Sequence, residues 1–196
     1  MTNFNEFIEK LIETYPISVK QNEEISKRLI YQTFKAKQQL LYEGDVSDRI
    51  FFVLEGLVRS YYYDERQHEH NTLFVAERGF IFSVTSYANQ QASFEYIEAL
   101  ENTKVCSLKK EDIDYFISLS SNLALIYARM SEQFLRVCDH RHRTLQLKPE
   151  ERYRTFKIEF PKLESRLKVD QLASFLGIGR STLLELKKNS PKIDLK

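Results

Sequence analysis

Basic and hydroxyl side chains gather in one short segment, residues 168–188, whose spacing is that of a helix-turn-helix. Ala173 is small where two crossing helices must approach closely, and Gly177 permits the positive φ of a tight turn. We expect the second helix to begin at Arg180. The apolar plug beneath it is formed by Ile178, Leu183 and Leu186.

The second helix of this segment carries side chains that suit contact with DNA. Arg180 can donate two hydrogen bonds to guanine. Glu185 repels phosphate, yet it can accept a hydrogen bond from the amino group of cytosine, so it sets specificity or weakens affinity. The predicted DNA-binding residues are Lys168, Arg180, Ser181, Thr182, Glu185, Lys187 and Lys188.

Charge is divided unevenly along the 196 residues, although the net charge is only +1. Residues 1–139 carry 15 Lys and Arg against 21 Asp and Glu, a balance of −6. Residues 140–196 carry 14 against 7, a balance of +7. A basic C-terminal segment behind an acidic one favours a polyanionic partner, through release of counterions from phosphates. A solvated helical surface is the alternative interpretation of the same charge.

The region from Ile30 to about Ser107 has the composition of strands. It consists of short runs rich in aromatic and β-branched residues, broken at turns such as Glu43-Gly44-Asp45 and Glu55-Gly56. About eight short antiparallel strands at this spacing predict a jelly-roll or related barrel, which can enclose a ligand. The predicted fold class is therefore α+β, with helices on both sides of the barrel in the chain.

Helical spacing returns after Lys109, first over residues 112–119 and then in a longer helix. In that longer helix, apolar residues recur at intervals of four and three, as in a two-helix seam, and they predict a homodimer. A core helix lying on the barrel would show the same stripe. The predicted interface residues are Leu123, Tyr127, Met130, Phe134 and Val137. Pro149 and Pro161 bracket another predicted helix.

The stretch from Leu41 to Arg59, LYEGDVSDRIFFVLEGLVR, resembles the start of a cyclic-nucleotide-binding domain. With the long helix and the helix-turn-helix, nearly the whole chain resembles the CRP/FNR superfamily of bacterial transcription regulators, in the compact form seen in Bacteroidetes. The resemblance implies a homodimer that binds double-stranded DNA and touches RNA polymerase, with a small molecule in the barrel. Independently of the resemblance, no apolar run is long enough for a membrane span and no catalytic motif occurs, so we expect a cytoplasmic protein that is neither a membrane protein nor an enzyme.

The chain departs from that family where cyclic AMP would bind. Residues 79–95 lack the Glu after the glycine and the Arg that cyclic AMP binders carry, so a buried phosphate would depend on neutral donors. We expect no tight binding of cyclic AMP, and the effector, if any, remains unidentified. The aromatic rings here are either barrel core or the wall of a more apolar pocket. The predicted pocket residues are Gly79, Phe80, Phe82, Ser83, Ser86, Gln91, Ser93 and Tyr127.

Two His-x-His pairs motivate one competing hypothesis, a cupin-like metal-binding barrel or enzyme. His68 and His70 would share a strand face, but they adjoin the polar cluster Asp64 to Gln67, which is typical of a hairpin tip. His140 and His142 lie among arginines, which repel a metal. We therefore predict no metal site and no catalytic residues. A dimeric adaptor that has lost DNA affinity is a further alternative.

The predicted organisation has three parts. Residues 1–110 form the barrel with an N-terminal helix, residues 111–147 the dimerisation helix region, and residues 148–196 the helix-turn-helix domain. The N-terminal helix is expected from the apolar stripe between Phe4 and Ile12, which ends before Pro16.

Overall fold

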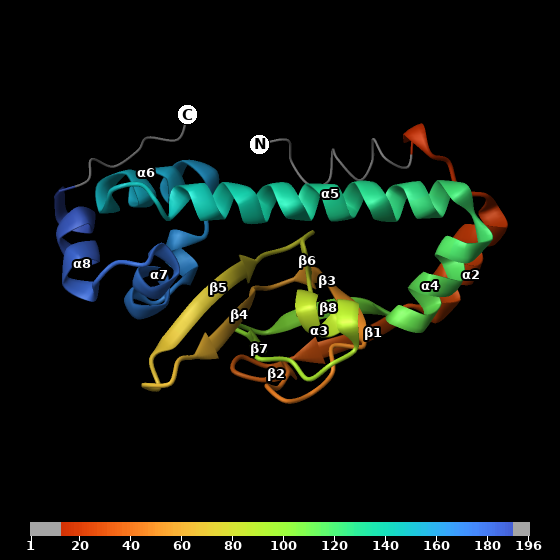
Figure 1. The fold of residues 1–196 in the computed structure, drawn as a ribbon, viewed down its shortest axis with the longest axis horizontal. Coiled ribbons are helices and arrows are strands. Elements are labelled where there is room, and N and C mark those ends of the chain that lie inside the picture. The colour runs from red at the N-terminus through yellow and green to blue at the C-terminus, as the bar shows by residue number, and fades with distance from the viewer. Residues whose placement is uncertain (1–12, 190–196) are drawn as a thin grey trace.

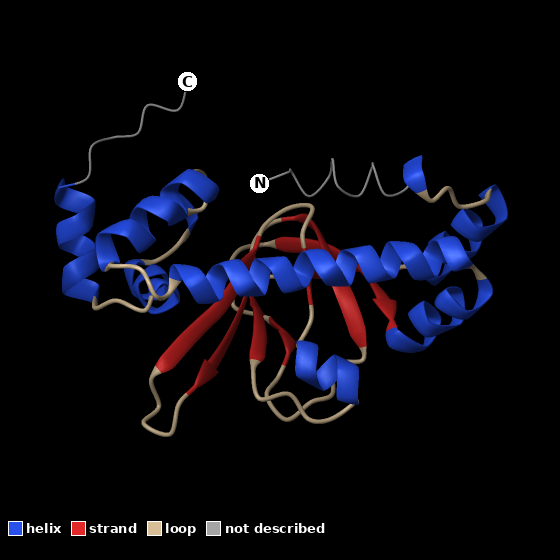
Figure 2. Ribbon diagram, turned by 45° about the horizontal axis from the view of Figure 1, so that its top comes forward, coloured by secondary structure: helices blue, strands red, loops and turns tan. Residues whose placement is uncertain are grey.

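A β-barrel lies beneath one long helix in the computed structural model, which describes residues 13–189 (Figure 1). Helices α6 to α8 gather at one end of α5, and α2 and α4 lie together at the other (Figure 2). The helices are α2 (Val19–Arg28), α3 (Val84–Asn89), α4 (Lys110–Leu119), α5 (Ser121–Thr144), α6 (Pro149–Glu159), α7 (Val169–Leu176), α8 (Arg180–Asn189) and the 3-10 helix η1 (Glu164–Arg166). The apolar stripe from Phe4 to Ile12 lies outside the described residues.

Eight strands form two four-stranded antiparallel sheets, ordered β1-β8-β3-β6 and β2-β7-β4-β5. Alternate side chains of both sheets meet in one apolar cluster, in which Val53, Val58 and Ile97 are fully buried. The predicted jelly-roll barrel and α+β class are confirmed. The strands are β1 (Ile30–Phe34), β2 (Gln39–Leu41), β3 (Arg49–Glu55), β4 (Val58–Tyr63), β5 (Glu69–Val75), β6 (Phe80–Ile81), β7 (Tyr96–Ala99) and β8 (Thr103–Lys109).

Gly56 joins β3 to β4, but these two strands do not pair with each other, because the chain passes there from one sheet to the other. The φ of Gly56 is +104°. A Cβ at this position would lie 2.5 Å from Oγ1 of Thr103 and 2.8 Å from the carbonyl oxygen of Asn102. Both the backbone conformation and the close approach therefore require glycine.

Helix α5 packs on the barrel through part of the stripe that the sequence predicts as a dimer seam. The ring of Phe134 lies 6.0 Å from that of Phe80 and 5.7 Å from that of Phe82, between centroids. Val137 lines the same side, beside β5 and β6. Phe134 and Val137 thus pack on the barrel, as the alternative of a core helix predicted. An apolar stripe of this spacing suits packing on a barrel as well as pairing of two helices.

A second apolar cluster joins the barrel to the three C-terminal helices. Leu57 and Phe74 of the barrel pack with residues of α6, α7 and α8, among which Leu172 and Leu183 are fully buried. The barrel and the C-terminal helices therefore share one core in this arrangement, and no flexible linker separates them. The segment of α7 and α8 is positioned by this core and by the end of α5.

Candidate nucleic-acid interface and barrel pocket

Helices α7 and α8 meet at the turn that the sequence predicts. Gly177 adopts φ +62°, and its N–H bonds the carbonyl oxygens of Ala173 and Ser174, which closes the end of α7. Ala173 is buried, and α8 begins at Arg180 as expected. Ile178 and Leu186 pack against the cluster that holds Leu183. The local geometry of a helix-turn-helix follows from these residues, because each occupies the position that its size or backbone freedom suits.

The polar side chains predicted to meet DNA lie largely on the outside of this pair. Arg180, Ser181, Glu185, Lys188 and Lys168 are exposed, and Thr182 is half-buried. The predicted residue Lys187 is also half-buried and pairs with Glu164 at 3.1 Å. The structure thus brings most of the predicted set to one solvent-facing region.

Arg180 is held by a carboxylate of the preceding helix. Its Nη1 lies 2.8 and 2.9 Å from the two carboxylate oxygens of Asp170. Both side chains are more than half exposed, so this ion pair contributes on the order of 0–1 kcal/mol and opens readily. Arg180 therefore remains available to a guanine edge.

The serines predicted to line a barrel pocket are buried and bonded to one another. Ser93 Oγ and Ser83 Oγ share a hydrogen bond of 3.0 Å, and Ser86 Oγ donates to the carbonyl oxygen of Gln91 at 2.5 Å. Ser86 Oγ also accepts from the backbone N of Ser47 at 2.9 Å. These hydroxyl groups already form hydrogen bonds within the protein, so they are not free to donate to a phosphate.

The barrel itself is matched by sequence. Residues 31–119 match the family model of the cyclic nucleotide-binding domain. The barrel is a cyclic nucleotide-binding domain. A comparison with curated proteins gave no match.

Solved structures resemble the chain well beyond the cyclic nucleotide-binding domain. FixK2 from Bradyrhizobium japonicum has a TM-score of 0.73 at 15% identity, over 82% of this chain and 83% of that chain. A transcriptional regulator of the CRP/FNR family from Eubacterium rectale has a TM-score of 0.65 at 18% identity, over 88% and 82%. A CooA mutant from Carboxydothermus hydrogenoformans has a TM-score of 0.67 at 16% identity, over 91% and 83%. The fold is that of the CRP/FNR transcription regulators.

A carboxylate occupies the interior of the cyclic nucleotide-binding domain beside the serine network. Glu95 is 8% exposed and accepts hydrogen bonds from the hydroxyls of Ser60 and Thr72, the second at 3.3 Å. Its backbone N and carbonyl oxygen both bond Ser93 Oγ. A negative charge so close to the predicted pocket opposes a second anion, because both would be poorly solvated there.

The aromatic residues near the predicted pocket belong to the packing between barrel and α5. Phe82 contacts Tyr87 at 5.1 Å between ring centroids, and both Phe80 and Phe82 contact Phe134. Burial, and to a smaller extent Tyr127, raises the pKa of the Tyr87 hydroxyl. Phe94, by contrast, is 54% exposed. Phe80, Phe82 and Tyr87 therefore belong to the core between the barrel and α5, as one of the two interpretations of these rings predicted.

The histidine pairs do not form a metal centre among residues 13–189. His68 Nδ1 and His70 Nε2 lie 3.2 and 3.1 Å from the same oxygen of Asp64, at the tip between β4 and β5. His140 pairs with Glu159 at 2.7 Å. In the part of the chain that the structure describes, no three His, Cys, Asp or Glu side chains are grouped so that they could hold a metal ion.

Sequence reasoning missed the side chains that fasten the C-terminal helices to the barrel. Ser174 Oγ donates to the carbonyl oxygen of Glu69 at 2.8 Å. Arg166 reaches Glu77 at 2.9 Å and Glu101 at 2.6 Å, which lie 89 and 65 residues away in the chain. No local spacing signals such partners.

None of the helices within the described residues is long and apolar enough to span a membrane.

Proposed function

We propose that this protein is a homodimeric DNA-binding transcription regulator of the CRP/FNR type. The observation that carries the proposal is the exposed row of polar side chains on α8, within a segment whose charge balance is +7, behind a cyclic nucleotide-binding domain and one long helix. Residues 1–110 would sense, 111–147 would pair the subunits and 148–196 would bind DNA. Contact with RNA polymerase follows from the resemblance to the family.

The dimer is supported by a second apolar row on α5, which faces away from the barrel. Leu125 is 42% exposed and Leu135 is 66% exposed, and Ala128 between them is exposed too. These residues are spaced by three and seven, so they share one helix face, which is turned away from Phe134. Two copies of α5 paired along this face would bury side chains that a single chain leaves in water.

Binding to DNA is tested by titrating the full chain against an operator selected from genomic fragments and against a random duplex. We expect two chains per operator, and a steep fall of affinity with rising salt because phosphate contacts release counterions. Arg180→Ala should cost about 1–3 kcal/mol on the operator and relax preference at one base position, whereas the matched control Lys188→Ala weakens both duplexes alike. Equal losses on both duplexes for Arg180→Ala contradict the assignment.

We infer that the cyclic nucleotide-binding domain does not hold cyclic AMP tightly. The bonded serines and the buried carboxylate of Glu95 support this, since a cyclic phosphate would meet hydroxyls that are already hydrogen-bonded and a carboxylate. Calorimetric titration of the full chain with cyclic AMP should show no binding at micromolar concentration. Heat that fits a low-micromolar or tighter site would overturn the inference.

A further inference from the structure

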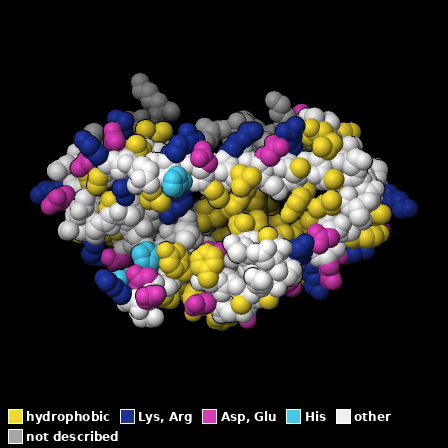
Figure 3. All heavy atoms as spheres, in the orientation of Figure 1, with side chains coloured by type: hydrophobic (Ala, Val, Ile, Leu, Met, Phe, Trp, Pro, Cys, Tyr) yellow, Lys and Arg dark blue, Asp and Glu magenta, His cyan; other side chains and the backbone are white. Residues whose placement is uncertain are grey.

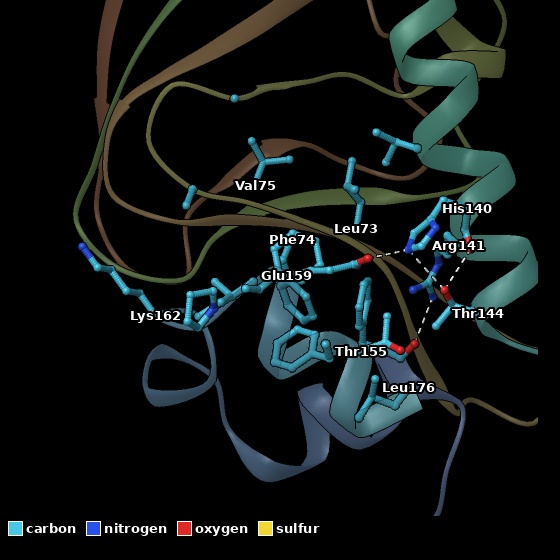
Figure 4. Close-up of a pocket in the computed structure, with 18 of the residues that line it drawn as sticks. Leu73, Phe74, Val75, His140, Arg141, Thr144, Thr155, Glu159, Lys162 and Leu176 are labelled. Carbon is cyan, nitrogen blue, oxygen red and sulfur yellow. Dashed lines mark hydrogen bonds and ion pairs between the residues drawn. The ribbon is translucent and has the colours of Figure 1, made fainter. Parts of the chain in front are cut away.

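A cavity of about 730 Å³ lies where the barrel, α5 and the C-terminal helices meet. Its walls come from β5 and the following turn, from the last turns of α5, and from α6 and the end of α7 (Figure 4). Apolar side chains gather in the hollow between α5 and the barrel (Figure 3). The cavity shares Gly79 and Phe80 with the predicted barrel pocket but is otherwise separate from it. Its apolar lining includes Leu73, Phe74, Val137, Leu145, Phe156 and Leu176.

Arg141 of α5 lines this cavity as a largely buried cation. Its Nη2 donates to the carbonyl oxygens of Asn71 and Phe175, at 3.2 and 3.1 Å, and its guanidinium carbon lies 4.0 Å from the centroid of the Phe175 ring. Burial lowers the pKa of Arg141 to about 10. Within residues 13–189 no carboxylate pairs with it. A cation withdrawn from water without an anion is costly, and a bound anion would remove that cost.

The remaining charged groups of the lining leave an excess of positive charge. Five cations line the cavity, against two carboxylates, Glu77 and Glu159. Both carboxylates are engaged, since Glu77 pairs with Arg166 at 2.9 Å and Glu159 with His140 at 2.7 Å. In Figure 4, Glu159 points toward His140, beside Arg141. The cations of the lining are Arg78, Arg141, Arg152, Lys162 and Arg166.

We propose that this cavity binds an organic monoanion with an apolar body, whose carboxylate meets Arg141. The apolar walls select a hydrocarbon or aromatic body, and the volume is that of sites for small organic molecules. One negative charge suits the guanidinium of Arg141, which has no carboxylate partner within the described residues.

Occupation of the cavity would affect more than the lining itself. Its walls belong to the barrel, to α5 and to α6, and therefore a bound anion stabilises this placement of the C-terminal helices over others. An effect on transcription rests on the proposed function. Binding itself does not, because it can be measured without DNA.

Calorimetry of the full chain with octanoate and with 1-octanol tests the proposal. Octanoate should bind about tenfold or more tightly than the alcohol, because only the carboxylate can pair with Arg141. Arg141→Gln should remove this preference by weakening octanoate about tenfold, with the alcohol unchanged. Equal affinity of the two probes, or no binding of octanoate at about 1 mM, overturns the proposal.

Two further variants separate the cavity from general effects. Arg136→Gln alters an exposed arginine on the same helix outside the cavity, and it should leave both affinities unchanged. Thr155→Trp fills the cavity from α6 while keeping Arg141, and it should abolish binding of both probes. Octanoate binding that survives Thr155→Trp contradicts the site even where Arg141→Gln fails to fold. Failure of DNA binding would leave each of these readouts intact.

Discussion

Two arginines are withdrawn from solvent in this molecule, and their surroundings differ in charge. Arg59 on β4 is 6% exposed, donates to Glu98 at 2.7 Å and pairs with Glu69 at 2.5 Å. Arg141 on α5 meets two backbone carbonyls and one aromatic ring. Burial lowers the pKa of Arg141. Burial acts in the same direction on Arg59, but the interactions with Glu69 and Glu98 outweigh it, so the pKa of Arg59 is raised overall.

This contrast separates a structural region from one with capacity to bind. The surface of the sheet at β4, β5 and β7 carries its own anions beside Arg59, so it has no need of a ligand. The cavity beside α5 carries apolar walls and an unmatched guanidinium, and it lacks the anion that would complete it among the described residues. The predictions below test how different the two sites are.

The largest effect is expected at Arg59. Arg59→Met leaves Glu98 and Glu69 without their cation in a region that water reaches poorly, which should lower the free energy of unfolding by about 3–5 kcal/mol. Urea denaturation followed by circular dichroism measures the change. A loss below about 1 kcal/mol would show that the carboxylates find other partners, and the contrast with Arg141 would then fail.

A moderate and pH-dependent effect is expected where Arg166 joins the C-terminal helices to the barrel. Hydrogen bonds from Arg166 lower the pKa of Glu77 to about 2. A carboxyl group whose pKa falls on folding stabilises the folded chain at pH values above its pKa in the unfolded chain, 4.5. This stabilisation is lost as the pH drops from 4.5 toward 2. Because Glu77 is 41% exposed, screening reduces the contribution to about 1 kcal/mol.

Glu77→Gln is the variant that isolates this contribution. It should lower the free energy of unfolding at pH 7 by about 1 kcal/mol and flatten its dependence on pH below 4.5. Urea denaturation at several pH values and at low and high salt provides the measurement. An unchanged slope between pH 4.5 and pH 2.5 would mean that the ion pair does not persist in solution.

The smallest effect on stability is expected at Arg141 itself. Arg141→Met removes two hydrogen bonds and a cation–π contact, but it also removes the cost of burying an unpaired charge. The free energy of unfolding should therefore stay within about 1 kcal/mol of that of the natural chain. A loss as large as that of Arg59→Met would assign Arg141 a structural role and weaken the case for a ligand site.

Local patterns were enough to predict the helix-turn-helix segment and the strands of the barrel. The turn at Gly177, the small Ala173 and the start of α8 at Arg180 were predictable because each depends on residues a few positions apart. The eight short strands were predictable for the same reason. The two faces of α5 were not, because Phe134 and Leu135 are both apolar and only the barrel decides which one it covers.

The same limit applies to the candidate sites. The sequence located the serines near the predicted pocket, but it could not show that Ser83, Ser86 and Ser93 bond within the protein or that Glu95 lies among them. The cavity at Arg141 had no signal in the sequence, since its lining comes from β5, α5, α6 and α7. Side chains from distant segments meet only when the chain has folded.

By itself, the sequence determined the kinds of element, their order, and the division of charge between an acidic N-terminal part and a basic C-terminal segment. These properties depend on periodicity and composition, which are local or additive. The tertiary structure decided which apolar face of α5 covers the barrel, which carboxylates neutralise Arg59 and Arg166, and that Arg141 has no carboxylate partner within the described residues. Burial and pairing depend on contacts between segments far apart in the chain, and so on the fold.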